Sequence, residues 1–169
     1  VNISALDFRQ RDFVANLAAI LEQTGLPPAQ LELEITESVL MQNVDDTVET
    51  LQKIKAMGVR LALDDFGTGY CSLSYLRRFP IDVLKTDQSF VHGLTVNSRD
   101  KQLISAIIAL GKSLELNIIA EGVETIEQLN VLKALQCEEG QGYLFSQALP
   151  AKDFAQLLRV GCDSLMPRQ

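Results

Sequence analysis

Short runs of apolar and β-branched residues alternate along the chain with longer stretches in which apolar residues recur at helical spacing. Each run is short enough to be a single strand, and most are followed by a stretch long enough to be a helix. The strand–helix unit therefore repeats along the chain. The runs predict six strands, at residues 1–4, 31–36, 59–66, 83–87, 116–123 and 141–146.

The stretches between the runs carry apolar stripes with the spacing that one face of a helix requires. Gly25, which precedes Pro27, and Gly58 are placed to end two of these helices. Thr125 and Gln128 have the spacing of a capping box, which predicts that a helix begins after the fifth strand. The three stripes consist of Phe13, Leu17 and Ile20; Val44, Val48 and Leu51; and Leu103, Ile107 and Leu110.

Strands that alternate with helices predict an α/β fold with a parallel sheet covered by helices. No linker or low-complexity segment interrupts the pattern, so residues 1–169 are expected to form one domain or part of one. Six strand–helix units fit an open, doubly wound sheet. They also fit part of an eight-unit barrel, which takes about 250 residues in full. The pattern alone leaves both architectures open.

The composition excludes several classes of protein. Hydrophobic residues make up 47% of the 169, as in an ordinary globular domain, and no apolar run is long enough to span a membrane. A net charge of −7 argues against binding to duplex nucleic acid, which needs a basic surface. Three scattered cysteines (Cys71, Cys137 and Cys162) suggest reduced thiols in the cytoplasm, and a single histidine, His92, expected in a solvated loop, argues against zinc.

Polar residues interrupt or end the predicted strands instead of being scattered. In parallel α/β folds the carboxyl ends of the strands lie together, and functional sites are built there. These residues are therefore expected to converge on one site. They are Asn2, Glu34, Asp64, Asp65, Lys85, Glu121 and Gln141.

The charges at these strand ends do not balance. Glu34 lies between Leu33 and Ile35 in a strand expected to be buried, where an unpaired carboxylate is costly. One lysine, Lys85, faces four carboxylates, and a structural network around that lysine remains the alternative to metal ions. The deficit favours metal. Carboxylate and amide oxygens indicate a hard cation such as Mg²⁺ or Mn²⁺, and a pair of such ions activates water for phosphodiester cleavage.

The glycine-rich turn after Asp64 and Asp65 superficially resembles a dinucleotide-binding loop. In such a loop the acidic residue follows the glycines by about 20 positions, whereas here two acids precede Gly67 and Gly69 and would repel a pyrophosphate. The turn is therefore interpreted as the loop of a metal site, and a nicotinamide-dependent oxidoreductase is disfavoured.

Six segments together resemble the successive motifs of the EAL domain family. This resemblance implies a TIM-type barrel that hydrolyses cyclic di-GMP to linear pGpG with two Mg²⁺ or Mn²⁺ ions. It covers nearly the whole chain, in the family's order and spacing. The segments are VNIS at 1–4, ELEITE at 32–37, DDFGTG at 64–69, LKTD at 84–87, IAEGVE at 119–124 and QGYLFS at 141–146.

The resemblance also implies roles for individual residues. Asn2, Glu34, Asp64 and Glu121 would ligate one metal ion, and Asp65 the second. Lys85 would act near the attacking water, so that the catalytic set is Lys85, Glu121, Asp64 and Asp65. Asp87, Gln141 and Glu124 would support the water or the substrate, and Glu37 would hold the loop that contains Gly67 and Gly69.

The chain departs from the family pattern in three places. Thr86 replaces the usual Ile of its motif, Cys71 replaces a Ser, and Gln147 and Ala148 replace a basic residue and Pro. The Thr86 change is expected to have little effect, because the β-branched shape is kept. The Gln147 change is expected to weaken contact with phosphate.

The Glu-Ala-Leu signature, which contributes a metal ligand in the family, is expected upstream of Asn2. The chain is therefore interpreted as the C-terminal two-thirds of an EAL domain, about six of eight units, with low activity by itself. A catalytically inactive cyclic di-GMP receptor is the alternative. The family implies a homodimer, a sensor or GGDEF domain in the parent protein, and a cytoplasmic location, with any membrane anchor in an upstream region.

Overall fold

The computed structural model describes residues 1–69 and 72–160, so the expectations for Cys71 and Cys162 lie outside the described residues. Cys137 is a free thiol, as expected. Across the described part of the chain, no helix combines the length and apolar character needed to cross a bilayer.

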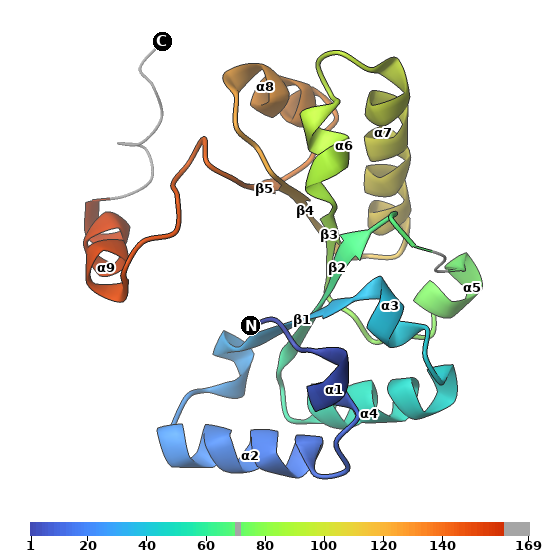
Figure 1. The fold of residues 1–169 in the computed structure, drawn as a ribbon, viewed down its shortest axis with the longest axis vertical. Coiled ribbons are helices and arrows are strands. Elements are labelled where there is room, and N and C mark those ends of the chain that lie inside the picture. Colours follow the sequence, from blue (N-terminus) through green and yellow to red (C-terminus); the bar gives the residue numbers. More distant parts are fainter. Residues whose placement is uncertain (70–71, 161–169) are drawn as a thin grey trace.

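The sheet has five parallel strands whose order in space is their order in sequence (Figure 1). In a doubly wound sheet the strand order reverses, whereas in a barrel it runs in one direction. The architecture left open by the sequence is thus the barrel type, and the five strands form an open arc of it. The strands are β1 (Glu32–Thr36), β2 (Arg60–Phe66), β3 (Val83–Thr86), β4 (Asn117–Glu121) and β5 (Glu139–Gln141).

The predicted helix ends and the predicted helix start are present in the structure. Gly25 caps a helix in the left-handed conformation, Gly58 also has a positive φ, and the capping box of Thr125 and Gln128 is present. The helical elements are α1 (Ala5–Phe8), α2 (Phe13–Thr24), η1 (Pro28–Gln30), α3 (Glu37–Leu40), α4 (Val44–Ala56), α5 (Leu73–Leu76), α6 (Gln88–His92), α7 (Ser98–Ser113), α8 (Ile126–Ala134) and α9 (Ala151–Val160).

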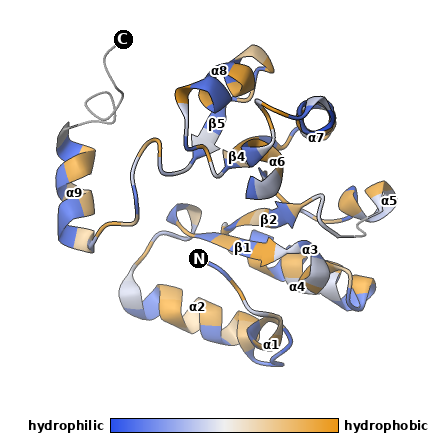
Figure 2. Cartoon of the chain, turned by 45° about the horizontal axis from the view of Figure 1, so that its top comes forward, coloured by the Kyte–Doolittle hydropathy of each residue, from blue (hydrophilic) through white to orange (hydrophobic). Residues whose placement is uncertain are grey.

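The core lies between the outer face of the sheet and the helices (Figure 2). In β1, Leu33 and Ile35 are buried, whereas the alternate residues, including Glu34, are only partly buried. Helices therefore cover only one face of this strand, whereas the sequence predicted that the strand as a whole would be buried. The opposite, inner face is left for polar side chains.

Two of the predicted helical stripes differ from the structure at one residue each, since Leu17 and Ile107 are buried as predicted. Ile20 is 56% exposed and Leu103 40% exposed, whereas Leu21 and Ile104 are buried in their place. Both alternatives satisfy helical spacing, and the angle at which the helix packs on the sheet decides between them.

The first and last predicted strands are wrong in extent. Asn2 forms only an isolated parallel bridge with Glu34, because the Ser4 side chain then accepts from the Asp7 amide and starts α1. The last strand ends at Gln141, where the chain turns and Leu144 donates its amide hydrogen to the Val123 carbonyl. Gln141 therefore lies at the carboxyl end of its strand and not at its beginning.

Thr86 is a buried polar residue in β3 with no exposed surface. Its hydroxyl has no hydrogen-bond partner among the described residues. A buried hydroxyl without a partner costs about 1 to 3 kcal/mol. The replacement of the family's usual Ile therefore has a cost that the β-branched shape alone does not reveal.

We expect Thr86→Val to raise the free energy of unfolding of the protein that contains this chain by about 1 kcal/mol, because the unpaired hydroxyl is removed at nearly constant shape. Urea denaturation measures the change. Thr47→Val is the matched control, since the buried Thr47 hydroxyl donates to the Gln42 carbonyl and its loss should destabilise. Equal effects of the two substitutions would contradict the explanation.

Candidate functional site

Four charged side chains converge at the carboxyl ends of consecutive strands. Glu34 comes from β1, Asp64 from β2, Lys85 from β3 and Glu121 from β4. Side chains alternate between the faces of a strand, and these four share the inner face. The sequence prediction that these strands deliver polar residues to one place agrees with this arrangement.

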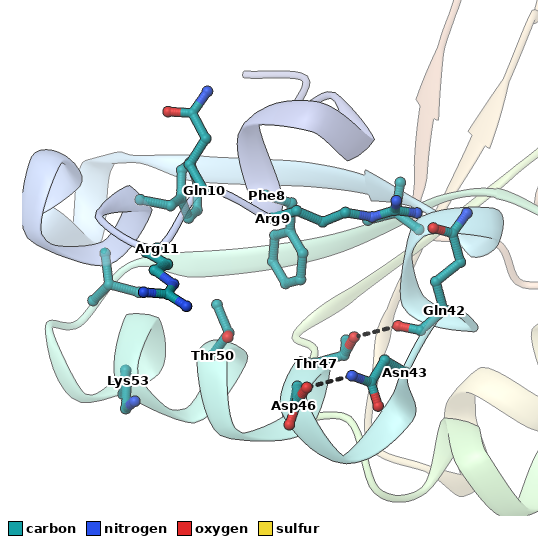
Figure 3. A pocket seen from close by; sticks show the side chains of 13 residues that line it. Phe8, Arg9, Gln10, Arg11, Gln42, Asn43, Asp46, Thr47, Thr50 and Lys53 are labelled. Carbon is teal, nitrogen blue, oxygen red and sulfur yellow. Dashed lines mark hydrogen bonds between the residues drawn. The ribbon is translucent and has the colours of Figure 1, made fainter.

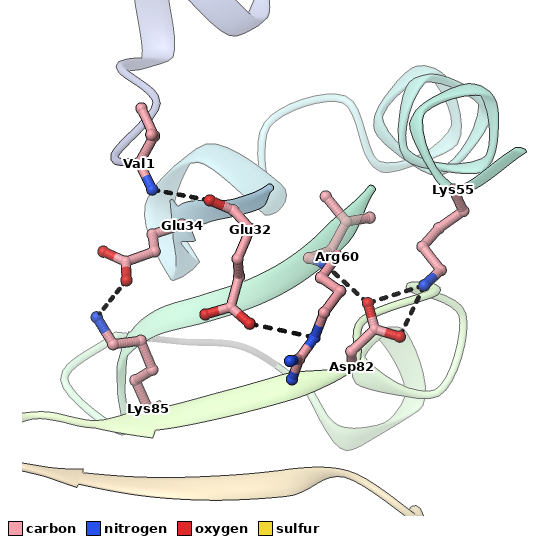
Figure 4. A network of polar contacts seen from close by, with 8 residues as sticks. Val1, Glu32, Glu34, Lys55, Arg60, Asp82 and Lys85 are labelled. Carbon is pink, nitrogen blue, oxygen red and sulfur yellow. Dashed lines mark hydrogen bonds and ion pairs between the residues drawn. The ribbon is translucent and has the colours of Figure 1, made fainter. Parts of the chain in front are cut away.

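The Lys85 ammonium group is the centre of the cluster. Its Nζ lies 2.6 Å from Glu121 Oε1, 2.9 Å from Glu34 Oε1 and 3.5 Å from Asp64 Oδ1. Its side chain is only 4% exposed. Figure 4 shows the contact that it makes across the inner face to Glu34. Burial lowers the pKa of Lys85, but the hydrogen bonds to Glu121 and Glu34 outweigh this and raise it above its ordinary value.

A β-bulge places two adjacent aspartates opposite this lysine. Leu63 is in register with Leu84, and Phe66 with Thr86, so two residues of β2 face one residue of β3. Those two are Asp64 and Asp65, and Asp65 has a φ of 54°. Aspartate tolerates this left-handed conformation better than most residues. Without the bulge, neighbouring strand residues would point to opposite faces of the sheet.

The bulge creates a group of three carboxylates that can share a cation. One oxygen each from Asp64, Asp65 and Glu121 lies within 4.8 Å of the others. Burial raises the pKa of Asp65, and the negative charges of Asp64 and Asp87 raise it further. Burial also raises the pKa of Glu121, despite its contact with Lys85. Crowded carboxylate oxygens of this kind suit a hard divalent ion, which would relieve their repulsion.

The loop after the aspartates is attached to α3 through Glu37. This carboxylate is 4% exposed, and its Oε2 accepts hydrogen bonds from the amides of Gly67 and Gly69, both at 3.3 Å. Gly67 has a φ of 98°, which favours glycine. A Cβ on Gly69 would lie 2.9 Å from the Glu37 carboxyl carbon. Both glycines are therefore needed for the close approach, and the continuation of the loop at Tyr70 lies outside the described residues.

The remaining predicted residues surround the cluster. Asn2 is paired with Glu34 through the isolated bridge, which places the two residues side by side. Gln141 is in register with Glu121 on the neighbouring strand. Asp87 caps α6 by accepting from the Ser89 amide at 2.8 Å.

Glu124 lies beside the cluster and not within it. It lines a cleft of about 220 Å³ together with Glu121, Gln141 and Tyr143. Its Oε1 is 3.5 Å from Nε2 of His92, which is the last residue of α6. His92 is exposed, as the sequence predicted, but it lies at the end of α6 and not in a loop. No local pattern indicated its contact with Glu124, because the two lie on different elements.

The comparisons with known proteins agree with the motifs. The family model described as the EAL domain matches residues 1–148, which confirms the resemblance. The chain is 46% identical over 160 residues to a Pseudomonas aeruginosa protein named cyclic di-GMP phosphodiesterase NbdA. This match covers 95% of the chain but only 20% of NbdA, so the chain spans a small part of that relative.

Two solved structures have the same fold. One is described as PaMucR phosphodiesterase in complex with c-di-GMP; it has a TM-score of 0.88 and 44% identity, over 91% of this chain and 62% of that one. The other is Klebsiella pneumoniae BlrP1 in a manganese and cyclic di-GMP complex. It has a TM-score of 0.80 and 31% identity, over 87% of this chain and 38% of that one.

We expect Lys85→Met to destabilise the protein by about 3 kcal/mol in the absence of divalent ions, because three largely buried carboxylates lose their shared cation. Chemical denaturation in EDTA measures the loss. Lys53→Met is the control, since the Lys53–Glu49 pair is exposed, and the midpoint should hardly move. Similar losses in both variants would show that the cluster does not depend on Lys85.

We expect Gly69→Ala to break the attachment of the loop, because the new methyl group would occupy the place of the Glu37 carboxylate. The Gly67 amide should then exchange with solvent faster, as measured by amide hydrogen exchange. Gly140→Ala is the control, since a Cβ there meets only ordinary contacts beginning at 3.5 Å. Unchanged protection of Gly67 in Gly69→Ala would contradict the role of this contact.

Proposed function

The chain belongs to the EAL domain family, and on this premise we propose that it forms part of a metal-dependent phosphodiesterase that hydrolyses cyclic di-GMP to linear pGpG. One observation carries the proposal: Asp64, Asp65 and Glu121 gather at one place, beside a buried lysine. The relatives support it, since NbdA is named a phosphodiesterase of this substrate and PaMucR is described in complex with it.

The donor set fits two divalent ions. Glu34, Asp64, Asp65 and Glu121 carry four negative charges against the single positive charge of Lys85, which leaves a net charge of −3 for cations to neutralise. We assign Asn2, Glu34, Asp64 and Glu121 to one ion and Asp65 to the second. Mg²⁺ or Mn²⁺ suits these oxygen ligands. When bound, such a pair lowers the pKa of water and stabilises the leaving oxygen.

The residues of the chain hold the substrate and the water in place. Lys85 is fixed by its close contacts to Glu121 and Glu34, and its third N–H group, on the side of Asp64 at 3.5 Å, would be the one aimed at the attacking water or at a phosphate oxygen. Asp87 and Gln141 flank the cluster and would orient the water or the substrate. Glu124 would act at the edge of the site. Glu37, through the amides of Gly67 and Gly69, would keep Asp65 in its bulged position.

The active unit is proposed to be larger than this chain. Residues 1–169 would be the C-terminal portion of one EAL domain, which accords with the 62% of the PaMucR chain that they cover. We further propose that this domain forms homodimers, works in the cytoplasm and is joined in its parent protein to a sensor or GGDEF domain.

We expect the intact protein to convert cyclic di-GMP to pGpG with Mg²⁺ or Mn²⁺ and to lose this activity in EDTA. Glu121→Gln and Asp65→Asn should each lower kcat by about 100-fold or more, because the carboxylates that hold the ions are weakened. Chromatographic detection of pGpG measures the rate. Glu49→Gln on the exposed face of α4 is the matched control and should keep full activity.

Binding measured on the same protein separates the enzyme from a receptor. A protein that melts cooperatively and binds cyclic di-GMP in EDTA, yet fails to hydrolyse it with Mg²⁺ or Mn²⁺, would favour the inactive receptor and overturn the proposal. Loss of both binding and hydrolysis in a folded protein would contradict both the phosphodiesterase and the receptor hypothesis.

A further inference from the structure

A second cavity lies away from the carboxylate cluster. It has a volume of about 630 Å³, and α1, the start of α2, the link between α3 and α4, and α4 itself form its walls (Figure 3). None of the residues assigned to the metal site lines it. Its size falls within the range of about 300 to 1,000 Å³ that is typical of small-molecule sites.

The floor of the cavity is apolar and partly aromatic. Phe8 and Val39 are buried, and Phe13 and Val14 are partly buried beside them. The rings of Phe8 and Phe13 lie 5.9 Å apart between centroids, tilted by 52°. Such a floor favours the planar or apolar part of a ligand.

The rim carries two arginines without partners of opposite charge. Arg9 and Arg11 lie in the link between α1 and α2, and neither forms an ion pair with any described carboxylate. The third cation, Lys53, pairs only with the exposed Glu49. The carboxylate of Asp46, which also lines the cavity, accepts a hydrogen bond from the Asn43 amide group (Figure 3).

The charge of the cavity is opposite to that of the whole chain. With Lys53 neutralised by Glu49, Arg9 and Arg11 against Asp46 give a local charge of +1, whereas the chain as a whole carries −7. In an acidic protein, two unpaired arginines beside one cavity attract an anion. Guanidinium groups bind phosphate oxygens in bidentate geometry, which makes phosphate the best match.

We propose that this cavity binds a nucleotide, with its base on the floor of Phe8 and Phe13 and its phosphates against the guanidinium group of Arg9 or of Arg11, which extend toward opposite ends of the cavity (Figure 3). The site needs no divalent ion, because the chain itself supplies the cations. It is also connected to the metal site. Val39 lines the cavity from α3, and two residues earlier in the same helix Glu37 holds the loop amides.

The test is calorimetric titration of the protein that contains this chain with GTP and with ATP, in EDTA. We expect saturable binding of at least one of them. The double variant Arg9→Ala/Arg11→Ala should weaken it at least tenfold, and Arg99→Ala, which removes another exposed arginine, should leave it unchanged. Pyrophosphate should bind more weakly than the nucleotide, because it lacks a base.

Two further variants keep the test decisive. Glu121→Gln should retain the binding, which separates this cavity from the catalytic site and from the success or failure of the proposed hydrolysis. Thr50→Trp fills the cavity without removing an arginine and should abolish binding, with circular dichroism showing that the helices are kept. Failure of both nucleotides to bind, unchanged affinity in the arginine variant, or loss of binding in Glu121→Gln would overturn the proposal.

Discussion

The contact of one buried ammonium group with three carboxylates is the constraint on which the rest of the structure depends. A charge on the inner face of a sheet must be paired, and Lys85 finds its partners on β1, β2 and β4. The carboxyl ends of these strands must therefore lie side by side. The parallel register, together with the helix caps and turns that follow the strands, fixes their relative positions.

This contact does not neutralise the charge of the cluster. Four carboxylates face the single positive charge of Lys85, and burial and neighbouring negative charges raise the pKa values of Asp65 and Glu121. A site of this kind reduces the stability of the chain that contains it, and ions that bind only the folded form would restore that stability. The cost in stability and the capacity to bind metal thus have one origin.

Much of the fold and of the site could be predicted from the sequence. The spacing of apolar residues in strands and helices depends on near neighbours, and polar residues within apolar runs are easily identified. The positions of Glu34, Lys85 and Glu121 required only that parallel strands end together. Register and packing angle are not local, so the extent of the first and last strands and the choice between Ile20 and Leu21 were missed. The bulge at Asp65 was also missed, because it arises from the pairing of β2 with β3 and not from either segment alone.

The bulge also limits how this segment of the chain can change during evolution. The length of the end of β2 is constrained as well as the identity of its aspartates. A deletion of one residue there would restore regular alternation with Phe66 still facing the core, but it would remove one acid from the inner face. The number of residues between Leu63 and Phe66 is therefore as much a part of the site as the aspartates themselves, and homologous chains that keep both acids should also keep this length.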